Sequence, residues 1–566
     1  MNIKYLLTFL CIILCSATTQ AGTFDDVKTI LSTSCAYSSC HDATNPAAGL
    51  DFSAGADIYS QLVGVAPFNS EAAAKGYDLI KPGDPARSFL YRKINYGLHD
   101  DSNLEENQGN NMPTGAAMDA HDIELVRQWI LFGAKDNNTT YVDPAILEEY
   151  YTDGGLERIE APAPPAEGEG FQLHFGPIFL EPNQELEYIY RYEVQNENAL
   201  EINGFDVAMN DQSHHFLFFK FNEGAETNQP DGLLEVTNAS SISGTAIAIS
   251  SDTKMIGGWA YSKEITLPEK TAYYWDENEV LKFNYHILNY SDAAVMPAEI
   301  YVNVMTQQLG TATHEMHSEF HLDSPFNLFI PPGEHSFDWN YDQFDEASPS
   351  DSVHIWALGA HTHKFGTDFD IYTQEGGQQG EQVYEGFYNI DYTVNQGFYD
   401  YSEPPFRFYD EFLTIKADDG LFITADYNNT SNSTVGFGLT TEDEMFGLFV
   451  QYLEGDISDL FEDPMDTVEN PMDTIPQTFI NFLPDYQNLH IYPNPTEGRI
   501  NIDLTNINEE VTVKIFNVLG QAVYEQKVMA ANTLHSVDLQ GNKNGFYFVQ
   551  IKGETVEATQ KLTLQN

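Results

Sequence analysis

The chain has 566 residues, 42% hydrophobic and 13% aromatic, so it can form several domains with sizeable cores, and disorder of the whole chain is excluded. Its 86 acidic residues far outnumber the 25 basic ones, and the formal net charge is −61. A field of this sign repels phosphate, which argues against nucleic acid and anionic lipid as partners.

Residues 1–21 are predicted to be a secretory signal peptide. Lys4 precedes the apolar run 5–15, which is too short to span a bilayer, and small residues follow at a plausible cleavage site. No other run of about 18 apolar residues occurs, so we expect no transmembrane segment. Cleavage leaves Cys35 and Cys40 as the cysteines of the mature chain.

Residues 22–137 are predicted to form a small all-α domain, because apolar residues recur at helical spacing near both of its ends. In Cys35-Ala-Tyr-Ser-Ser-Cys40-His41, two thiols lie beside an imidazole, which suits haem attachment with His41 as an iron ligand. Four residues separate the cysteines where attachment motifs usually have two. A local Cys35–Cys40 disulfide with an incidental histidine is therefore an alternative.

The same segment resembles the small cytochrome c domains of planctomycete and related bacterial surface proteins. The motifs that carry the resemblance are Gly49-Leu-Asp-Phe52, Lys81-Pro-Gly-Asp-Pro-Ala-Arg87, Asn111-Met-Pro-Thr114 and Leu125-Val-Arg-Gln-Trp-Ile130. The resemblance implies haem c attached through Cys35 and Cys40. It also implies that His41 and Met112 bind the iron, with Met118 as the substitute for Met112.

Two linkers are predicted. Residues 138–170 include a proline-rich and then glycine-rich stretch, and residues 456–484 are acidic, with Pro-Met-Asp-Thr beginning at both Pro464 and Pro471. Residues 171–455 between them contain short alternating strands separated by Gly, Asn and Asp clusters. This pattern predicts one or two β-sandwiches.

The β-rich region contains an unusual set of histidines and one methionine. The set is His214, His215, His286, His361, His363 and Met445. The first two are adjacent, and His361-Thr-His363 has the i, i+2 spacing that puts two imidazoles on one face of a strand. Imidazole binds copper in both oxidation states, whereas a thioether favours Cu(I). The set therefore predicts two copper sites with unlike ligands.

The order His-His, His, His-Thr-His, Asp-Glu-Met resembles the copper type II monooxygenases, the peptidylglycine α-hydroxylating and dopamine β-monooxygenase group. Its context is His215-Phe-Leu-Phe-Phe219, Val353-His-Ile-Trp-Ala357 and Asp443-Glu-Met445. The resemblance implies two jelly-roll halves, residues 171–318 and 319–455. It implies that the electron-storing copper is bound by His214, His215 and His286. It assigns the oxygen-activating, catalytic copper to His361, His363 and Met445. His354 either supports the second site or is a structural histidine.

The module departs from that family in two respects. It has no cysteine, so its stability must come from core packing and strand pairing. Peptidylglycine enzymes bind the substrate carboxylate at positions that are Gly359, Gly447 and Phe449 here, and glycine cannot form a bidentate clamp. We therefore expect a small or apolar substrate, with O2 as co-substrate and electrons from ascorbate, another donor or the fused cytochrome.

Residues 485–566 are predicted to be a further small β-sandwich, and they resemble the C-terminal sorting domain of the Bacteroidetes type IX secretion system. The motifs are Leu489-His-Ile-Tyr-Pro-Asn-Pro495, Val513-Lys-Ile-Phe-Asn-Val-Leu-Gly520 and Asn544-Gly-Phe-Tyr-Phe-Val-Gln-Ile551. The resemblance implies an export address that the type IX machinery reads, and a secreted or cell-surface location. His490 is not expected to bind metal.

Three functional hypotheses follow from the residues and the resemblances. The first is a copper-dependent monooxygenase that hydroxylates a C–H bond. The second is a non-catalytic surface protein that stores copper or passes electrons; two differentiated sites argue modestly against it. The third, an adhesin built of β-sandwiches, leaves the ligand set unexplained.

Overall fold

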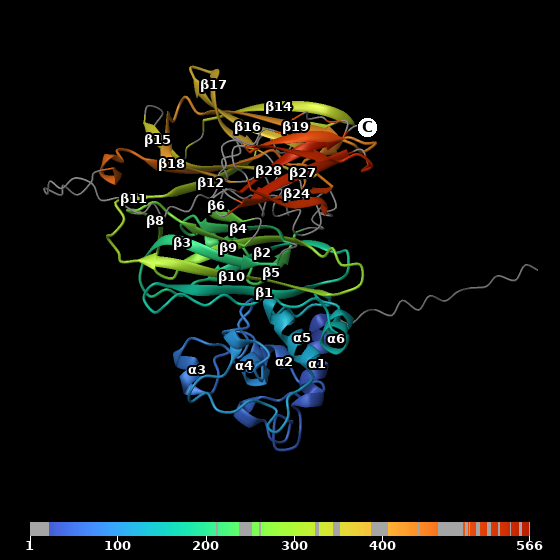
Figure 1. The fold of residues 1–566 in the computed structure, drawn as a ribbon. Coiled ribbons are helices and arrows are strands. Elements are labelled where there is room, and N and C mark those ends of the chain that lie inside the picture. Colours follow the sequence, from blue (N-terminus) through green and yellow to red (C-terminus); the bar gives the residue numbers. More distant parts are fainter. Residues whose placement is uncertain are drawn as a thin grey trace, which may run out of the picture. The chain divides into compact units, whose positions relative to one another are not determined.

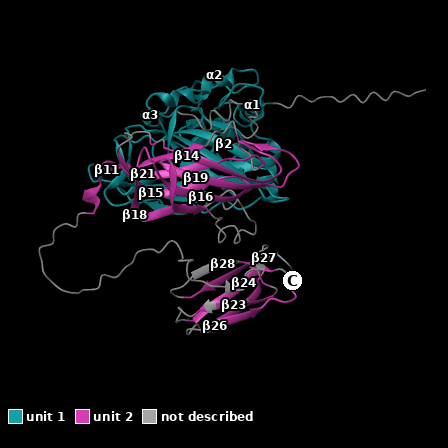
Figure 2. Ribbon diagram, turned by 90° about the horizontal axis from the view of Figure 1, so that it is seen from above, with its two compact units in different colours: residues 1–313 teal, residues 314–566 magenta. Residues whose placement is uncertain are grey.

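The computed structural model of the chain contains many strands and few helices, as predicted for several β-sandwich domains. Before the tail it describes residues 22–210, 213–236, 252–259, 262–322, 328–342, 344, 351–386, 406–438 and 442–461. In the tail it describes 491–492, 496, 498–504, 510–517, 522–529, 533–543, 545–553 and 557–564. The predicted signal peptide and His490 lie outside these residues. The chain divides into two compact units, Met1–Thr313 and His314–Asn566, which Figure 2 colours separately.

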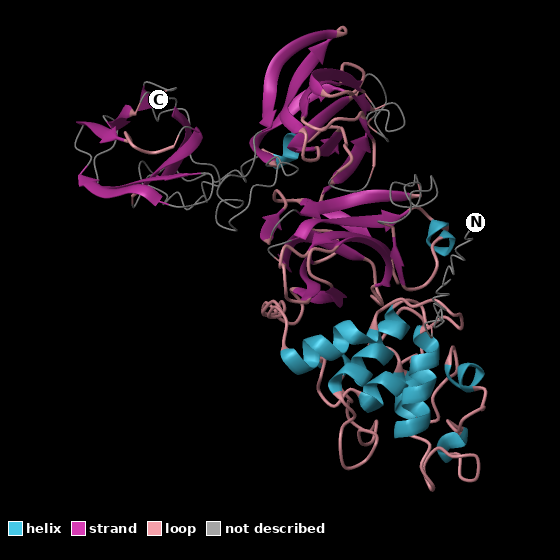
Figure 3. Ribbon diagram, turned by 90° about the vertical axis from the view of Figure 1, so that its right-hand side faces the viewer, coloured by secondary structure: helices cyan, strands magenta, loops and turns pink. Residues whose placement is uncertain are grey.

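The first unit begins with a helical segment, residues 22–153, shown in cyan in Figure 3. Its α-helices are α1 (Thr23–Ser34), α2 (Ile58–Leu62), α3 (Ser70–Ala74), α4 (Phe89–Ile94), α5 (Ala120–Leu131) and α6 (Pro144–Asp153). In α1 the residues Phe24, Val27 and Leu31 share one face and are buried, which explains why this amphipathic stretch is helical.

Helix α6 forms within residues 138–170, the segment predicted to be a linker. Asp143 caps the helix by accepting a hydrogen bond from the Ala145 N–H, and Pro144 occupies the first turn, where its missing N–H costs nothing. Leu147 is buried in the core of the helical segment. The helical segment therefore extends about one helix beyond its predicted end.

The strands of the first unit form two sheets (Figure 1). One contains β1 (Gly170–Leu180), β10 (Met296–Gln307), β3 (Leu200–Met209) and β8 (Thr271–Trp275) in that order, with β7 (Lys263–Thr266) beside β3. The other has the order β5 (Leu233–Glu235), β2 (Glu185–Glu193), β9 (Val280–Leu288), β4 (Ser213–Phe221), β6 (Thr253–Trp259). Phe205 of the first sheet packs against Phe218 and Trp259 of the second, with ring centroids 5.7 and 5.5 Å apart. This aromatic core makes the two sheets a sandwich.

The helical segment and this first sandwich share buried polar contacts. Arg127 of α5 donates hydrogen bonds to the carbonyls of Gly176 and Pro177 in β1, the latter at 2.9 Å. Arg158, five residues beyond the helical segment and partly exposed, pairs with Glu299 of β10 at nitrogen–oxygen distances of 2.9 and 2.7 Å. Two sandwich residues also join the hydrophobic core of the helical segment: Phe179 and Val295.

The second unit contains another sandwich. One sheet has the order β12 (His317–Leu322), β21 (Gly447–Glu454), β15 (Ser352–His361), β18 (Arg407–Lys416). The other has the order β14 (Gly333–Tyr341), β19 (Leu421–Asn429), β16 (Gly366–Glu375), β17 (Gln378–Gly386). Short strands β13 (Phe329–Ile330) and β20 (Val435–Gly436) pair with each other in a two-stranded sheet of their own. Leu358 and Val450 from one sheet share a buried core with Ile371 and Ile423 from the other.

The tail is a third, smaller β-structure with its own core. Its strands are β22 (Ile491–Tyr492), β23 (Arg499–Leu504), β24 (Glu510–Asn517), β25 (Ala522–Met529), β26 (Thr533–Asp538), β27 (Gly545–Lys552) and β28 (Glu557–Leu564). They form the sheets β22-β23-β26 and β25-β24-β27-β28. Ile502, Val513 and Ile551 are among the residues of a core that includes no residue before the tail.

Candidate metal centre

His361 and His363 lie where β15 ends. The Cα partner of His361 across β15 and β21 is Gly447, and His363 follows in the turn beyond the strand. The two imidazole rings are 5.2 Å apart between centroids at an interplanar angle of 88°, and both side chains are buried. The i, i+2 spacing predicted two side chains on one face of a strand. The structure ends the strand at the first histidine and brings the second close to it through the turn.

Met445 lies two residues before β21, at the end of that strand nearest His361. Its side chain is buried, and its backbone carbonyl accepts a hydrogen bond from the Tyr427 hydroxyl at 2.6 Å. Because Gly447 faces His361 across the sheet, strand register brings the segment of Met445 to the same sheet end as the histidines. The predicted nitrogen and sulfur ligands thus come from the ends of two paired strands.

Glu444 connects the two segments. Its fully buried carboxylate accepts hydrogen bonds from the backbone N–H groups of His363 at 2.8 Å, Phe365 at 2.7 Å and Met445 at 3.1 Å. Burial disfavours its charged form and raises the pKa of Glu444 to about 7. From the sequence, no role was predicted for Glu444 beyond its place in the Asp443-Glu-Met445 motif. A carboxylate directly before a predicted apolar ligand was the signal that could have identified it.

A backbone hydrogen bond decides which nitrogen of His363 can bind a metal. Nδ1 of His363 lies 3.2 Å from the carbonyl oxygen of Asp443, which can only accept, so Nδ1 carries the hydrogen. In the neutral imidazole the lone pair is then on Nε2. A hydrogen bond of this kind holds the ring orientation of metal-binding histidines.

His215 and His286 form the corresponding pair in the first unit. They are direct Cα partners between β4 and β9, both are buried, and their ring centroids are 5.3 Å apart. His214 precedes His215 in β4, and its side chain lies outside the described residues. Strand pairing therefore joins two of the three predicted nitrogen ligands of this site.

In His215 and His286 a hydrogen bond involves Nε2, whereas in His363 a hydrogen bond involves Nδ1. Nε2 of His286 lies 2.8 Å from a carboxylate oxygen of Glu185, and Nε2 of His215 lies 2.9 Å from Oδ1 of Asn284. Asn284 in turn donates to Glu187 at 2.8 Å, which orients its oxygen toward the imidazole. Both histidines therefore carry hydrogen on Nε2 and the lone pair on Nδ1.

The predicted haem residues lie at the start of the helical segment and beyond α4. Cys35 is half-buried at the end of α1, Cys40 is exposed, and both are free thiols. Burial, followed by the charge of Cys40, raises the pKa of Cys35 to about 11. His41 lies 5.0 Å from Phe52 between ring centroids, and its Nδ1 is 3.3 Å from the Leu50 carbonyl.

The two candidate sulfur ligands of the haem iron differ in burial. Met112 is 38% exposed, and its backbone N–H donates to the Lys93 carbonyl at 2.7 Å. Met118 is partly buried against the helical core.

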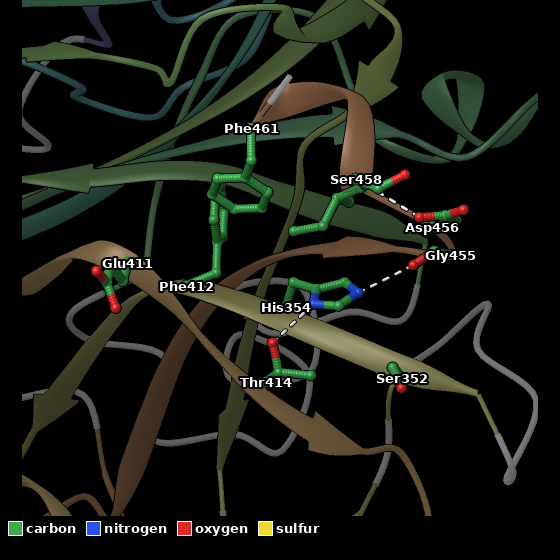
Figure 4. A pocket seen from close by; sticks show the side chains of 10 residues that line it. Ser352, His354, Glu411, Phe412, Thr414, Gly455, Asp456, Ser458 and Phe461 are labelled. Atoms are coloured by element: carbon green, nitrogen blue, oxygen red, sulfur yellow. Dashed lines mark hydrogen bonds between the residues drawn. The ribbon is translucent and has the colours of Figure 1, made fainter. Parts of the chain in front are cut away.

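His354 lies near the start of β15, whereas His361 ends the strand. Its ring nitrogens lie 2.8 Å from the Thr414 hydroxyl and 2.9 Å from the Gly455 carbonyl. It lines a pocket of about 570 Å³ with Phe412 and Phe461, shown in Figure 4. His361 lies seven positions further along the strand, about 23 Å away at the usual rise per residue. These contacts favour the structural interpretation of His354 over support of the metal site.

Two family matches cover parts of the chain. Residues 321–460 match the copper type II ascorbate-dependent monooxygenase, C-terminal domain, and this range includes His361, His363 and Met445. Residues 490–565 match the secretion system C-terminal sorting domain, which indicates secretion or a cell-surface location. The resemblances predicted for these two parts are confirmed. None of the helices that the structure describes has the length and apolar character needed for a membrane span.

Individual relatives cover little of the chain or differ strongly in structure. Ulvan lyase NLR42 of Nonlabens ulvanivorans is 39% identical over 61 residues, which is 11% of this chain and 11% of the lyase. The major capsid protein P2 of bacteriophage PM2 is 7% identical with a TM-score of 0.18, covering 50% of this chain and 97% of that one. The CBM51-2 and INT domains of Clostridium perfringens ZmpB are 9% identical with a TM-score of 0.11, covering 45% and 83%.

Proposed function

We propose that this chain is an exported copper-dependent monooxygenase that uses O2 to hydroxylate a C–H bond of a small or apolar substrate. The observation that carries the proposal is that the chain segments of His361, His363 and Met445 meet at one sheet end, with Glu444 bonded to the backbone of both segments. The match of residues 321–460 to the copper monooxygenase C-terminal domain supports it.

The donor sets fit copper. In the proposal, His361, His363 and Met445 hold one ion, and His214, His215 and His286 hold the other. Copper bound there supplies the one-electron steps that reactions with O2 require. A shell that includes a thioether favours Cu(I), whereas an all-imidazole shell suits both oxidation states.

The surrounding residues fix the ligand atoms before metal binds. The Asp443 carbonyl holds His363 so that Nε2 carries the lone pair. Glu185 and Asn284 hold His286 and His215 so that Nδ1 does. Ligands that are already oriented lose less conformational entropy on binding, and such outer contacts typically contribute 10- to 100-fold to metal affinity.

The experiment measures copper content and oxygen uptake with ascorbate on the same preparations. Wild-type protein is expected to bind two copper ions and consume O2, and the His361→Ala and Met445→Ala variants to lose O2 uptake. His354→Ala is the matched control, because it removes a histidine of the same strand that contacts Thr414 and Gly455 instead. Unchanged O2 uptake in the ligand variants refutes the proposal. Full copper occupancy without any oxygen-dependent product supports the alternative of a surface copper-binding or electron-transfer protein.

We further propose that the helical segment is a cytochrome c domain that supplies electrons. Its haem would be attached through Cys35 and Cys40, with His41 and Met112 as iron ligands. His41 fits this role, since its Nδ1 donates to the Leu50 carbonyl and the lone pair is on Nε2. Fusion raises the effective concentration of an electron donor near its acceptor.

The haem proposal is tested by the absorption spectrum of the mature protein. We expect a Soret band that survives acid–organic extraction and that disappears in the double variant Cys35→Ala, Cys40→Ala. A colourless wild-type protein refutes the proposal. Thiol titration of that protein then shows whether the two cysteines form the alternative disulfide.

A further inference from the structure

One face of the sheet β12-β21-β15-β18 is buried against the facing sheet, and the other face carries His361. Leu358 and Ala360 of β15 belong to the buried core. Because side chains alternate along a strand, Gly359 and His361 face the opposite side. Phe449 of β21 faces that side too, since its neighbours also belong to the core: Leu448 and Val450.

Phenylalanines form a row across this outer face, next to His361. Phe320 is the Cα partner of Phe449, and Phe449 is the Cα partner of Gly359. Phe406, directly before β18, continues the register opposite Gly359, because Leu358 pairs with the residue after it. We call Phe320, Phe449 and Phe406 the phenylalanine row.

The rings of the phenylalanine row contact one another and approach the candidate ligand. Phe320 and Phe449 have ring centroids 4.6 Å apart, and Phe449 and Phe406 have centroids 5.1 Å apart. The Phe320 ring lies 6.1 Å from that of His361, in an edge-to-face arrangement. Phe449 is 6% exposed, whereas Phe320 and Phe406 are half-buried and retain accessible surface. The row is therefore a continuous aromatic surface that begins beside His361.

Two glycines make room for these rings. A Cβ added at Gly359 would lie 2.7 Å from Cε1 of Phe406, and a Cβ at Gly447 would lie 2.8 Å from Cε2 of Phe320. Such distances are shorter than carbon–carbon van der Waals contact, so any larger residue at either position displaces a ring. A side chain long enough to clamp a substrate carboxylate therefore cannot be accommodated at either position while the rings stay where they are.

The basic residues that neighbour this site in sequence are engaged elsewhere. Lys364, next to His363, pairs with Glu442. Arg407, next to Phe406, donates to the Val383 carbonyl and lies over the Tyr409 ring. Neither cation is placed to bind a substrate carboxylate, and the net charge of −61 disfavours an anion further.

We propose that the phenylalanine row binds a neutral aromatic group of the substrate beside His361, and that Gly359 and Gly447 determine this specificity by admitting the rings. The inference rests on the proposed copper-dependent function, because it assigns the substrate class of the same centre. Aromatic rings bind one another in offset or edge-to-face geometry, and the partly accessible rings of Phe320 and Phe406 can offer such contacts to a ligand ring.

The test compares two probes that differ only in charge, 3-phenylpropanamide and 3-phenylpropionate. Binding to the full-length, copper-loaded and ascorbate-reduced protein is measured by calorimetry without O2, so that turnover does not contribute. We expect the amide to bind and the carboxylate to bind at least about tenfold more weakly. Equal binding of the two probes, or binding of neither, overturns the inference.

A variant and a matched control locate the binding surface. Phe406→Leu keeps an apolar side chain but removes the ring, and it is expected to weaken amide binding roughly tenfold. Phe412→Leu makes the same change on β18 at the pocket shared with His354, and it should bind the amide as wild type does. Unchanged amide affinity in Phe406→Leu overturns the assignment to the row. If that variant does not fold, Phe320→Leu takes its place.

Copper content and O2 uptake, measured on the same samples, separate this inference from the proposed function. If the protein binds copper and consumes O2 but does not discriminate between the probes, only the substrate assignment is wrong. If the protein binds no copper or takes up no O2, the proposed function is wrong. Selective binding of the amide would then indicate an aromatic binding site of another kind.

Discussion

Glu444 illustrates how one side chain can organise the candidate copper site without binding metal. The two ligand segments, which contain His363 and Met445, come from two strand ends. Both donate a backbone N–H to the same buried carboxylate. A buried acceptor with several donors is costly to remove, since each donor then loses its hydrogen-bond partner inside the protein.

Replacing Glu444 with Gln should therefore destabilise the second unit. Gln keeps the size of the side chain but presents one oxygen and one NH₂ group, so at least one of the N–H groups of His363, Phe365 and Met445 loses its acceptor. We expect a loss of about 1–3 kcal/mol in the free energy of unfolding, measured with urea. We also expect weaker copper binding by the His361 site only.

Glu411→Gln is the control for this prediction, because Glu411 is an exposed carboxylate of β18 in the same sheet. Its stability should stay within about 0.5 kcal/mol of wild type. Equal effects of the two substitutions would contradict the role assigned to Glu444.

At the scale of elements, helix α5 is the main polar connection between the helical segment and β1. Glu124 of this helix is fully buried and contacts Nε2 of His99 at 2.6 Å, the Tyr151 hydroxyl at 3.1 Å and Arg127 at 3.1 Å. Arg127 also donates to two carbonyls of β1. Buried ions need such complete pairing, because removal of one partner leaves an uncompensated charge.

Arg127→Met should consequently destabilise the first unit strongly. Methionine fills similar space, but Glu124 loses its guanidinium partner and the carbonyls of Gly176 and Pro177 lose a donor. We expect the free energy of unfolding to fall by about 3–5 kcal/mol, as measured by chemical unfolding. Lys28→Met on the exposed face of α1 is the control and should cost at most about 0.5 kcal/mol. Near-equal free energies of unfolding for the two variants would show that the ionic contacts of Arg127 contribute little to stability.

His174 of β1 should make the stability of the first unit depend on pH. Its ring lies 3.1 Å from Asp101 in the helical segment and 3.2 Å from Glu299 in β10, and it stacks on Tyr301 at 4.3 Å. Although burial opposes the charge, hydrogen bonds to these two carboxylates raise the pKa of His174 above 6.5. The pKa values of Asp101 and Glu299 are lowered by the same contacts, against the effect of burial.

The direction of this pH dependence follows from the coupling between protonation and folding. A raised histidine pKa gives stability that is fully present below pH 6.5 and is lost as the pH rises through the raised value. The lowered carboxylate pKa values of Asp101 and Glu299 give stability that is lost in acid. The stability difference between wild type and His174→Gln should therefore shrink from pH 6 to 9, as measured by urea unfolding across this range. A difference that stays constant with pH would contradict the assignment.

At the scale of the whole molecule, the candidate copper site and the match to the sorting domain occupy separate parts of the chain. The match to the sorting domain covers residues 490–565, and the tail has its own hydrophobic core. The match to the copper monooxygenase C-terminal domain ends at residue 460. Export and metal binding should thus be separable by truncation.

A chain that ends at residue 461 should stay in the periplasm of a type IX-competent host and still bind copper there. The measurement is the distribution of the protein among periplasm, cell surface and medium, with copper analysis of the periplasmic fraction. The reciprocal control attaches residues 462–566 to an unrelated secreted reporter, which should reach the surface or medium. Export of the truncated chain at the wild-type level would contradict the address assigned to the tail.

The amino-acid order was sufficient for the local patterns of this protein and for the family resemblance of two of its parts. Alternating apolar residues predicted the β-rich region, and the resemblance of its motifs to known families predicted the C-terminal copper monooxygenase half and the sorting tail, both of which the family matches confirm. The metal ligands themselves stay predictions, as does the haem in the helical segment. These inferences succeeded where residue type and short-range spacing carry the information.

Features that depend on long-range pairing appear only in the folded chain. That His215 faces His286, and that Gly447 faces His361, follows from strand register, which the packing of distant strands decides. From the sequence alone, the glycine at position 359 indicated only that a substrate clamp had been lost. The fold shows that the ring of Phe406 occupies the space beside it, because side chains remote in sequence compete for the same volume wherever they pack together.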